Sequence, residues 1–199
     1  MDCLDEAALL RQARSGGRAA FGRLQAALDP VVRRFARRLI GPSDAEDDIV
    51  REMFLALYMN LGRLETAERL RPFVFRVVRN LCYTELRRLR RFEVVSLDAA
   101  APESAAAWLI DPCPPLDEQV QWGLLYSDVQ AAMDRLPELQ RQSLILYCEE
   151  DLSYEQIAEA MATDIGTVKS RIHYARRNLR RLLPPDTREA LGLKSEEKE

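Results

Sequence analysis

Apolar residues recur three and four positions apart along most of the chain, and this spacing predicts helices rather than strands. The clearest stripe in the first half runs from Phe21 to Leu39 and stops at Gly41-Pro42, a pair that ends helices. Glycine is sparse, while leucine, alanine, arginine and glutamate dominate the composition. We therefore expect an all-α fold with almost no strand.

Further helices are expected after this stripe. Ser43 or Asp44 can cap a helix whose apolar residues fall over 49–58. A short break over 60–71 follows, and Pro72 is well placed to open the next helix. These successive amphipathic helices can bury one another's apolar faces, so they are expected to form one small domain.

The second half of the chain carries the start and stop signals of a short helix. Leu136-Pro137 interrupts the helical pattern, which then resumes. Ser153, with Gln156 three residues later, forms a capping box. This box predicts a short helix over 154–161.

A turn leads from this short helix to a longer basic one, expected over 166–183 with Asp164 as its N-cap. A short helix, a tight turn and a basic helix make a helix-turn-helix, whose second helix lies in the major groove of DNA. The apolar residues of the last helix fall at steps of four, three, four and three, which defines the side packed on the domain. They are Val168, Ile172, Ala175, Leu179 and Leu182.

The rest of the surface of the last helix is basic and polar, which favours DNA binding over the alternative of a solvated basic face. Arginine reads guanine through O6 and N7, so side chains in the first turns are expected to choose the sequence. Arg180 and Arg181, farther along, are better placed to contact phosphates. The residues expected to face DNA are Thr167, Lys169, Ser170, Arg171, His173, Tyr174, Arg176 and Arg177.

A stretch of different composition separates the two halves. Residues 94–121 contain no lysine or arginine, include four prolines and lack sustained periodicity, so they predict a flexible linker. The chain is thus divided into a helical domain at 5–93, the linker at 94–121, a second helical domain at 122–185 and a tail at 186–199. The acids of the linker are Asp98, Glu103, Asp111, Asp117 and Glu118.

The linker also changes how the net charge is interpreted. The chain has 29 basic and 32 acidic residues, a formal net charge of -3. Because the acidic linker has no basic residue, the net charge hides a basic excess elsewhere. No run approaches the roughly 20 apolar residues of a membrane span, and the amino terminus has no apolar run, so we expect a cytoplasmic protein.

Residues that could hold a metal are too dispersed to form a site. The four cysteines lie far apart with no CxxC pair, and His173 is the single histidine, so no zinc site and no cofactor are expected. The acids at 149–151 could suggest an enzyme, but no histidine, metal set or phosphate loop accompanies them. We interpret them as a solvated helix end and expect no catalytic residue.

The motifs of the second domain resemble those of a known family. LPELQR at 136–141, LSYEQIA at 152–158 and GTVKSRIHYAR at 166–176 are similar to region 4 of bacterial sigma factors of the extracytoplasmic-function (ECF) type, members of the sigma-70 family. In that family this helix-turn-helix reads the promoter -35 element. The resemblance implies that the residues facing DNA bind this element.

The first domain carries a second, independent resemblance. AEDDIVREMF at 45–54, FVFRVVRNL at 73–81 and RRLRR at 87–91 are similar to sigma region 2. The resemblance implies that a helix of this domain docks on the clamp coiled coil of the RNA polymerase beta-prime subunit. The residues implied are Asp47, Asp48, Arg51, Glu52 and Phe54.

Sigma region 2 also engages the promoter -10 element, and the loop at 64–71 would shape a pocket for a flipped base. Melted DNA exposes unpaired bases, which need a basic groove and a cavity. For the basic cluster at 87–91, a solvated helix end is an equally good interpretation. The residues implied at the -10 element are Arg76, Arg79, Asn80, Arg87 and Arg88.

The resemblance implies three kinds of partner: core RNA polymerase, through its beta-prime clamp and beta flap; promoter DNA; and an anti-sigma protein. It also suggests that the acidic linker lies along a positively charged polymerase channel. Ala162 departs from the family pattern, because glycine is frequent at that turn. The alternative is a helix-turn-helix regulator that binds DNA without joining polymerase, which leaves the motifs of the first domain unexplained.

Overall fold

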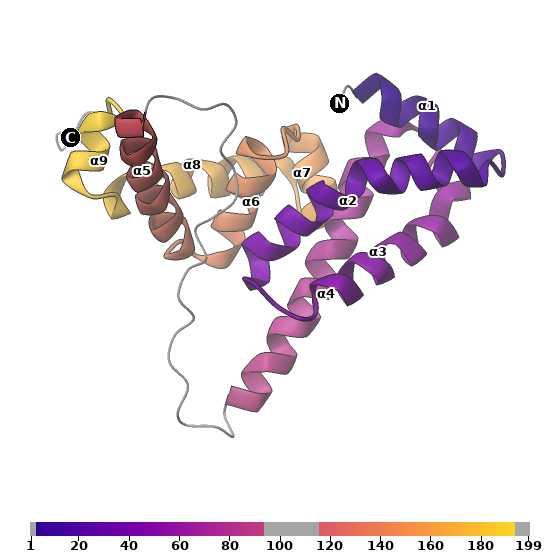
Figure 1. Cartoon of the computed structure of the whole chain (residues 1–199), viewed down its shortest axis with the longest axis horizontal. Helices are drawn as coiled ribbons and strands as arrows, with labels where there is room; N and C mark the ends of the chain where they lie inside the picture. Colours follow the sequence, from indigo (N-terminus) through magenta and orange to yellow (C-terminus); the bar gives the residue numbers. More distant parts are fainter. Residues whose placement is uncertain (1–2, 94–115, 194–199) are drawn as a thin grey trace.

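The computed structural model describes residues 3–93 and 116–193, with side chains over 6–89 and 123–193. Within these ranges every regular element is a helix, as the spacing of apolar residues predicted. The helices fall into two consecutive groups on opposite sides of the molecule (Figure 1). No helix of the described ranges is long and apolar enough to cross a membrane.

The first group occupies the predicted domain at 5–93. Helix α2 packs on α1, α3 and α4, and the rings of Phe35 and Phe75 meet edge to face in the core, with centroids 4.9 Å apart. The second half of α4 extends beyond the other helices (Figure 1). The elements are α1 (Cys3–Arg14), α2 (Arg18–Ile40), α3 (Glu46–Asn60), the 3-10 turns η1 (Leu61–Arg63) and η2 (Ala67–Arg69), and α4 (Leu70–Glu93).

The second group holds the predicted helix-turn-helix. Helix α8 packs on α5, α6 and α7 through Val168, Ile172 and Ala175, which are fully buried, so the predicted apolar side of this helix is confirmed. The elements are α5 (Leu116–Asp134), α6 (Glu138–Cys148), α7 (Tyr154–Met161), α8 (Ile165–Leu182) and α9 (Pro185–Ala190).

Two helix starts in the first group differ from the prediction. Helix α3 begins at Glu46 after Ala45, and Ser43 does not cap it but accepts the Ala45 N–H at 3.2 Å in the preceding turn. Helix α4 begins at Leu70, so Pro72 lies inside its first turn. Proline is tolerated there because the first N–H groups of a helix have no partner within the helix.

Two segments outside the predicted second domain are also helical. Helix α5 begins at Leu116, inside the expected linker, whose residues 94–115 lie outside the described residues. Helix α9 occupies the start of the expected tail, where Thr187 is buried and its hydroxyl donates a hydrogen bond to Asp128 of α5. Six residues are too few to show helical periodicity in the sequence, so contact with α5 decides this element.

The capping residues of the helix-turn-helix agree with the sequence. The Gln156 N–H donates to Ser153 Oγ at 3.2 Å, and the Ser153 N–H donates to Gln156 Oε1 at 2.9 Å, which completes the capping box. Asp164 Oδ1 accepts the Thr167 N–H at 2.7 Å and caps α8. The hydrogen bonds from Thr167 lower the pKa of Asp164, so the cap is ionised at neutral pH.

The turn between α7 and α8 is made by a residue in an unfavourable conformation. Ala162 has φ 50° and ψ 52°, the left-handed region that favours glycine, and its N–H still donates to α7 carbonyl groups. An L-residue with a side chain pays about 1–2 kcal/mol in this region. Glycine would occupy this turn without that steric cost.

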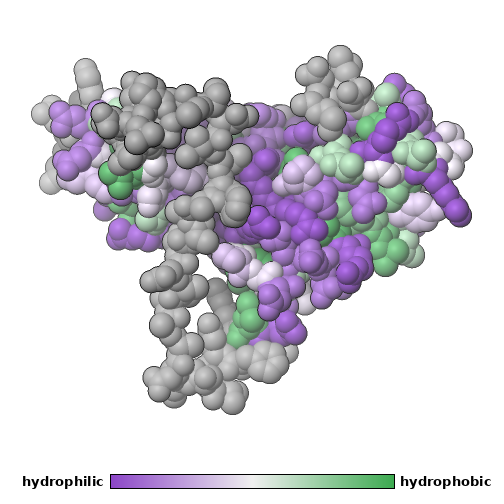
Figure 2. Space-filling model, in the orientation of Figure 1, coloured by the Kyte–Doolittle hydropathy of each residue, from purple (hydrophilic) through white to green (hydrophobic). Residues whose placement is uncertain are grey.

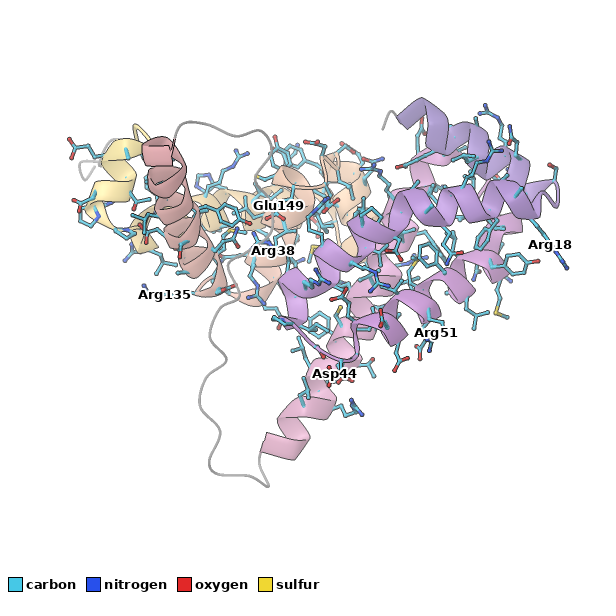
Figure 3. The ribbon with its side chains drawn as sticks, in the orientation of Figure 1. Arg18, Arg38, Asp44, Arg51, Arg135 and Glu149 are labelled. Carbon is cyan, nitrogen blue, oxygen red and sulfur yellow. The ribbon has the colours of Figure 1, made fainter. Side chains whose placement is uncertain are left out.

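The two groups of helices pack against each other, mainly α4 on α7, and one cluster of buried apolar residues runs through both. Ion pairs surround this contact. Arg38 of α2 pairs with Glu149 at the end of α6, and Figure 3 shows the two side chains between these helices. Beside them, Arg34 donates three hydrogen bonds to the Glu150 carboxylate, from Nε at 3.2 Å and from Nη2 at 2.8 and 2.9 Å.

The strained turn leads to a stability prediction. Ala162→Gly should raise the free energy of unfolding by about 1 kcal/mol, because glycine adopts the left-handed conformation without the steric cost. Ala26→Gly, the same change at an exposed position inside α2, should lower it by about 1 kcal/mol. Urea unfolding of both variants measures the difference, and a destabilised Ala162→Gly variant would contradict the steric account.

Candidate nucleic-acid interface

The surface of α8 divides sharply around the helix axis. Opposite the buried Val168 and Ile172, the side chains are exposed and mostly basic or polar. Thr167 is half-buried and its hydroxyl donates to Asp164 Oδ2 at 2.6 Å, so this residue serves the helix cap. The exposed members of the predicted set are Lys169, Ser170, His173, Tyr174, Arg176 and Arg177.

Arg171 differs from the other residues of this set because it is half-buried and lies on the side of α8 nearer the first group of helices. Its positive charge acts electrostatically on Arg79 of α4. Burial lowers the pKa of the Arg79 guanidinium, and the nearby Arg171 lowers it further. The charge of one predicted -35 residue therefore influences that of one predicted -10 residue, across the contact between the two groups.

The predicted -10 residues all lie on α4 but do not share one face. At 100° per residue, Arg76, Asn80 and Arg87 fall within about 40° of one another. Arg79 points toward α7, where its Nη1 donates to the Met161 carbonyl at 3.5 Å. Arg88 lies elsewhere on the helix and pairs with Glu85 at 2.8 Å.

The predicted pocket loop at 64–71 is held by its neighbours on both sides. Leu64 and Leu70 are buried, Arg14 of α1 donates to the Glu65 carbonyl at 3.1 Å, and Gln156 of α7 donates to the Glu68 carbonyl at 3.3 Å. A surface pocket exists elsewhere, between α1, α2 and the end of α3. In this arrangement the loop contacts the second group of helices.

Four of the five predicted polymerase-binding residues are exposed along α3. Asp47 pairs with Arg33 of α2 at 2.6 Å, and this ion pair lowers the pKa of the Asp47 carboxyl. Asp48 pairs with Arg51 at 2.9 Å, and Figure 3 shows Arg51 pointing away from the body of the molecule. Glu52 is exposed one residue farther along the helix.

Phe54 is the exception in this set, because the structure places it in the interior. Its side chain is 5% exposed and belongs to the core of the first group. A position on α3 that resembles a family contact residue can still face inward, since the helix turns 100° per residue. Large hydrophobic residues that the sequence analysis did not select are exposed on α3, namely Leu55, Tyr58 and Met59. Figure 2 shows hydrophobic surface, in green, among the hydrophilic side chains of the first group of helices.

The acids at 149–151 are not the solvated helix end that the sequence predicted. Glu150 is 2% exposed, and burial raises the pKa of its carboxyl although Arg34 opposes this rise. Arg71 of α4 also donates to the Glu150 carbonyl oxygen at 3.4 Å. The sequence holds no signal for these contacts, because the partners lie more than 75 residues away along the chain.

Two family models match the chain in the same order as its two groups of helices. "Sigma-70 region 2" matches residues 24–92, which span α2 to α4. "Sigma-70, region 4" matches residues 126–179, from α5 into α8.

Curated proteins and solved structures are similar over most of the chain. The ECF RNA polymerase sigma factor EcfG of Rhodopseudomonas palustris is 32% identical over 82% of this chain and 84% of its own. The RNA polymerase sigma factor NccH of Alcaligenes xylosoxydans is 30% identical over 90% and 95%. Among solved structures, the sigma factor RpoE of Bartonella quintana, in complex with the anti-sigma factor NepR, has a TM-score of 0.62 and 29% identity over 81% of this chain and 95% of that one.

The fold, the divided surface of α8 and these similarities agree with one another. The first group of helices is sigma region 2 and the second is sigma region 4. The chain belongs to the sigma-70 family and is a sigma factor of the ECF group, a factor for transcription initiation.

Proposed function

We propose that this sigma factor binds core RNA polymerase through the exposed face of α3 and recognises promoter DNA through α4 and α8. The observation that carries the proposal is the division of α8 into a buried apolar side and an exposed basic side. The N-terminus of α8 and that of the preceding α7 are each capped by a side-chain hydrogen bond. A recognition helix needs this rigid support because base contacts depend on accurate placement.

At the -35 element, the two ends of α8 have different tasks. Ser170, in the second turn, is exposed where a recognition helix meets base edges. Arg181, exposed in the last turn, is placed for the phosphate backbone. Sequence choice therefore comes from the start of the helix, and much of the affinity from its end.

At the -10 element, Arg76, Asn80 and Arg87 form the DNA-facing row of α4. Arg76 is supported by Phe73, whose ring centroid lies 5.7 Å from its guanidinium carbon. The row continues onto the part of α4 that extends beyond the other helices, where a DNA strand has access (Figure 1). The loop at 64–71 completes this site once region 4 no longer contacts it.

The described arrangement is closed, and binding to a promoter requires it to open. The -10 and -35 elements are about 25 base pairs apart, which is roughly 85 Å of B-DNA at about 3.4 Å per base pair. Here Arg79 of region 2 donates to the Met161 carbonyl of region 4, and Gln156 of region 4 contacts the loop expected to hold a flipped base. The two regions must therefore separate before both elements are bound.

The proposed partners follow from the family and from α3. Core polymerase would meet Asp48, Arg51 and Glu52, together with the apolar Leu55 and Tyr58 beside them, which suits a mixed polar and apolar interface. The similar RpoE is bound to an anti-sigma factor. We accordingly expect an anti-sigma protein to hold this chain away from polymerase.

Reconstitution with core polymerase tests the function. Run-off transcription on a genomic library should give start sites that share two promoter elements, and Glu52→Lys should weaken core affinity by about ten-fold, or 1.4 kcal/mol. Glu189→Lys, the same reversal on α9, is the control and should bind normally. DNA binding without any association with core polymerase would instead indicate an ordinary helix-turn-helix regulator.

The two tasks assigned to α8 are separable by mutation. Arg171→Ala should relax the preference at one -35 base pair by about 1–3 kcal/mol, because a bidentate guanine contact is lost. Arg181→Ala should weaken all promoters alike and reduce the slope of log K against log salt by about 0.9. Promoter-binding titrations at several salt concentrations measure both effects, and equal behaviour of the two variants would refute the division.

The closed arrangement should depend on the buried carboxylate. Arg34→Met leaves Glu150 buried without its main partner, which should weaken the contact between the regions by about 3 kcal/mol. Small-angle X-ray scattering should then show a larger radius of gyration. Arg18→Met on the same helix is exposed and serves as the control, and an unchanged radius for Arg34→Met would show that other contacts hold the regions together.

A further inference from the structure

Two tyrosines stack on each other between the helices that support the recognition helix. Tyr147 lies near the end of α6 and Tyr154 is the first residue of α7. Their ring centroids are 5.3 Å apart and the ring planes are inclined by 9°. The stack therefore joins α6 to α7 at a point on the surface, next to α8.

A basic side chain of α8 lies over each of these two rings. The guanidinium carbon of Arg176 lies 4.9 Å from the Tyr147 centroid, and Lys169 Nζ lies 5.8 Å from the Tyr154 centroid. Both distances are within the range of cation–π interactions. The two cations are seven residues apart, about two turns, so they project from the same side of α8.

Arg176 is held by a second feature besides the ring. It lies at the C-terminal end of α6, close enough to Cys148 to oppose the rise in the pKa of that thiol caused by burial. The C-terminus of a helix attracts cations through its free carbonyl groups. The side chain of Arg176 is thus restricted although it is exposed.

Other exposed cations of α8 lack this support. Within the described residues, Arg177 and Arg181 make no contact with an aromatic ring. A long basic side chain loses rotamer freedom when it binds a phosphate, unless it is already ordered. The exposed basic side chains named here are therefore of two kinds: those ordered by an aromatic ring and those without such a ring.

We propose that Tyr147 and Tyr154 are positioning residues for promoter binding, which hold Arg176 and Lys169 in place to contact phosphate oxygens of duplex DNA. The proposal rests on the proposed function and adds residues outside the recognition helix to the DNA interface. The tyrosines act through the cations. One exposed cation–π contact corresponds to about two- to five-fold in an equilibrium constant.

The test measures promoter affinity of the reconstituted holoenzyme at several salt concentrations. Tyr147→Leu should weaken binding about two- to five-fold, with little change in the salt slope, because Arg176 still reaches the phosphate but must first be ordered. Tyr147→Phe keeps the ring face and should bind like the wild type. In the Arg176→Ala background, Tyr147→Leu should have no further effect.

A double-mutant cycle separates positioning from a general structural role. If Tyr147→Leu weakens binding equally with and without Arg176, or if Tyr147→Phe behaves like Tyr147→Leu, the proposal is overturned. Arg177→Ala removes a cation that has no ring, so its effect should be additive with that of Tyr147→Leu. A holoenzyme without salt-dependent promoter binding would overturn the proposed function as well. Normal loss of binding in Arg177→Ala, together with no coupling between Arg176 and Tyr147, would overturn this inference alone.

Discussion

The contact between the two described groups of helices is built around one buried carboxylate. Glu150 lies in the turn between α6 and α7, receives two hydrogen bonds from Arg34 Nη2, and its backbone carbonyl accepts from Arg71, which also holds Glu6 of α1. Burial outweighs the ion pair and raises the pKa of Glu150. Buried ion pairs add little net stability, but an unpaired buried charge is costly. The pair therefore acts mainly by excluding other relative positions of the two regions.

The contact between the two regions decides which of the proposed functional residues are exposed. With region 4 docked on α2 and α4, Arg79 and Arg171 lie at the contact between the regions. The outer face of α3 and much of the basic face of α8 stay exposed. In this state the surfaces that we propose for polymerase and for phosphates are exposed, while the two helices that we propose to read the promoter lie too close together to bind both of its elements.

Local features of the site could be predicted wherever one short stretch contains both interacting groups. Ser153 and Gln156 are three residues apart, as are Asp164 and Thr167, so the caps and the helix between them follow from the sequence. Phe54 shows the limit of prediction by resemblance. It belongs to a motif that marks a docking helix, yet its ring faces the core, because only the packing of α3 decides which side of the helix is outward.

The sequence by itself determined the helices, the turn and the apolar side of α8, since periodicity and capping depend on residues within a few positions of one another. The division into two sigma regions followed from the resemblance of its motifs to that family. Only the tertiary structure decided which charged side chains are buried and with which partners they pair. Glu149 and Glu150 look like a solvated helix end, and Arg34 and Arg38 look like the polar side of α2, until folding brings them together. Burial and pairing of a charge depend on its neighbours in space, and these neighbours lie more than 100 residues away in the chain.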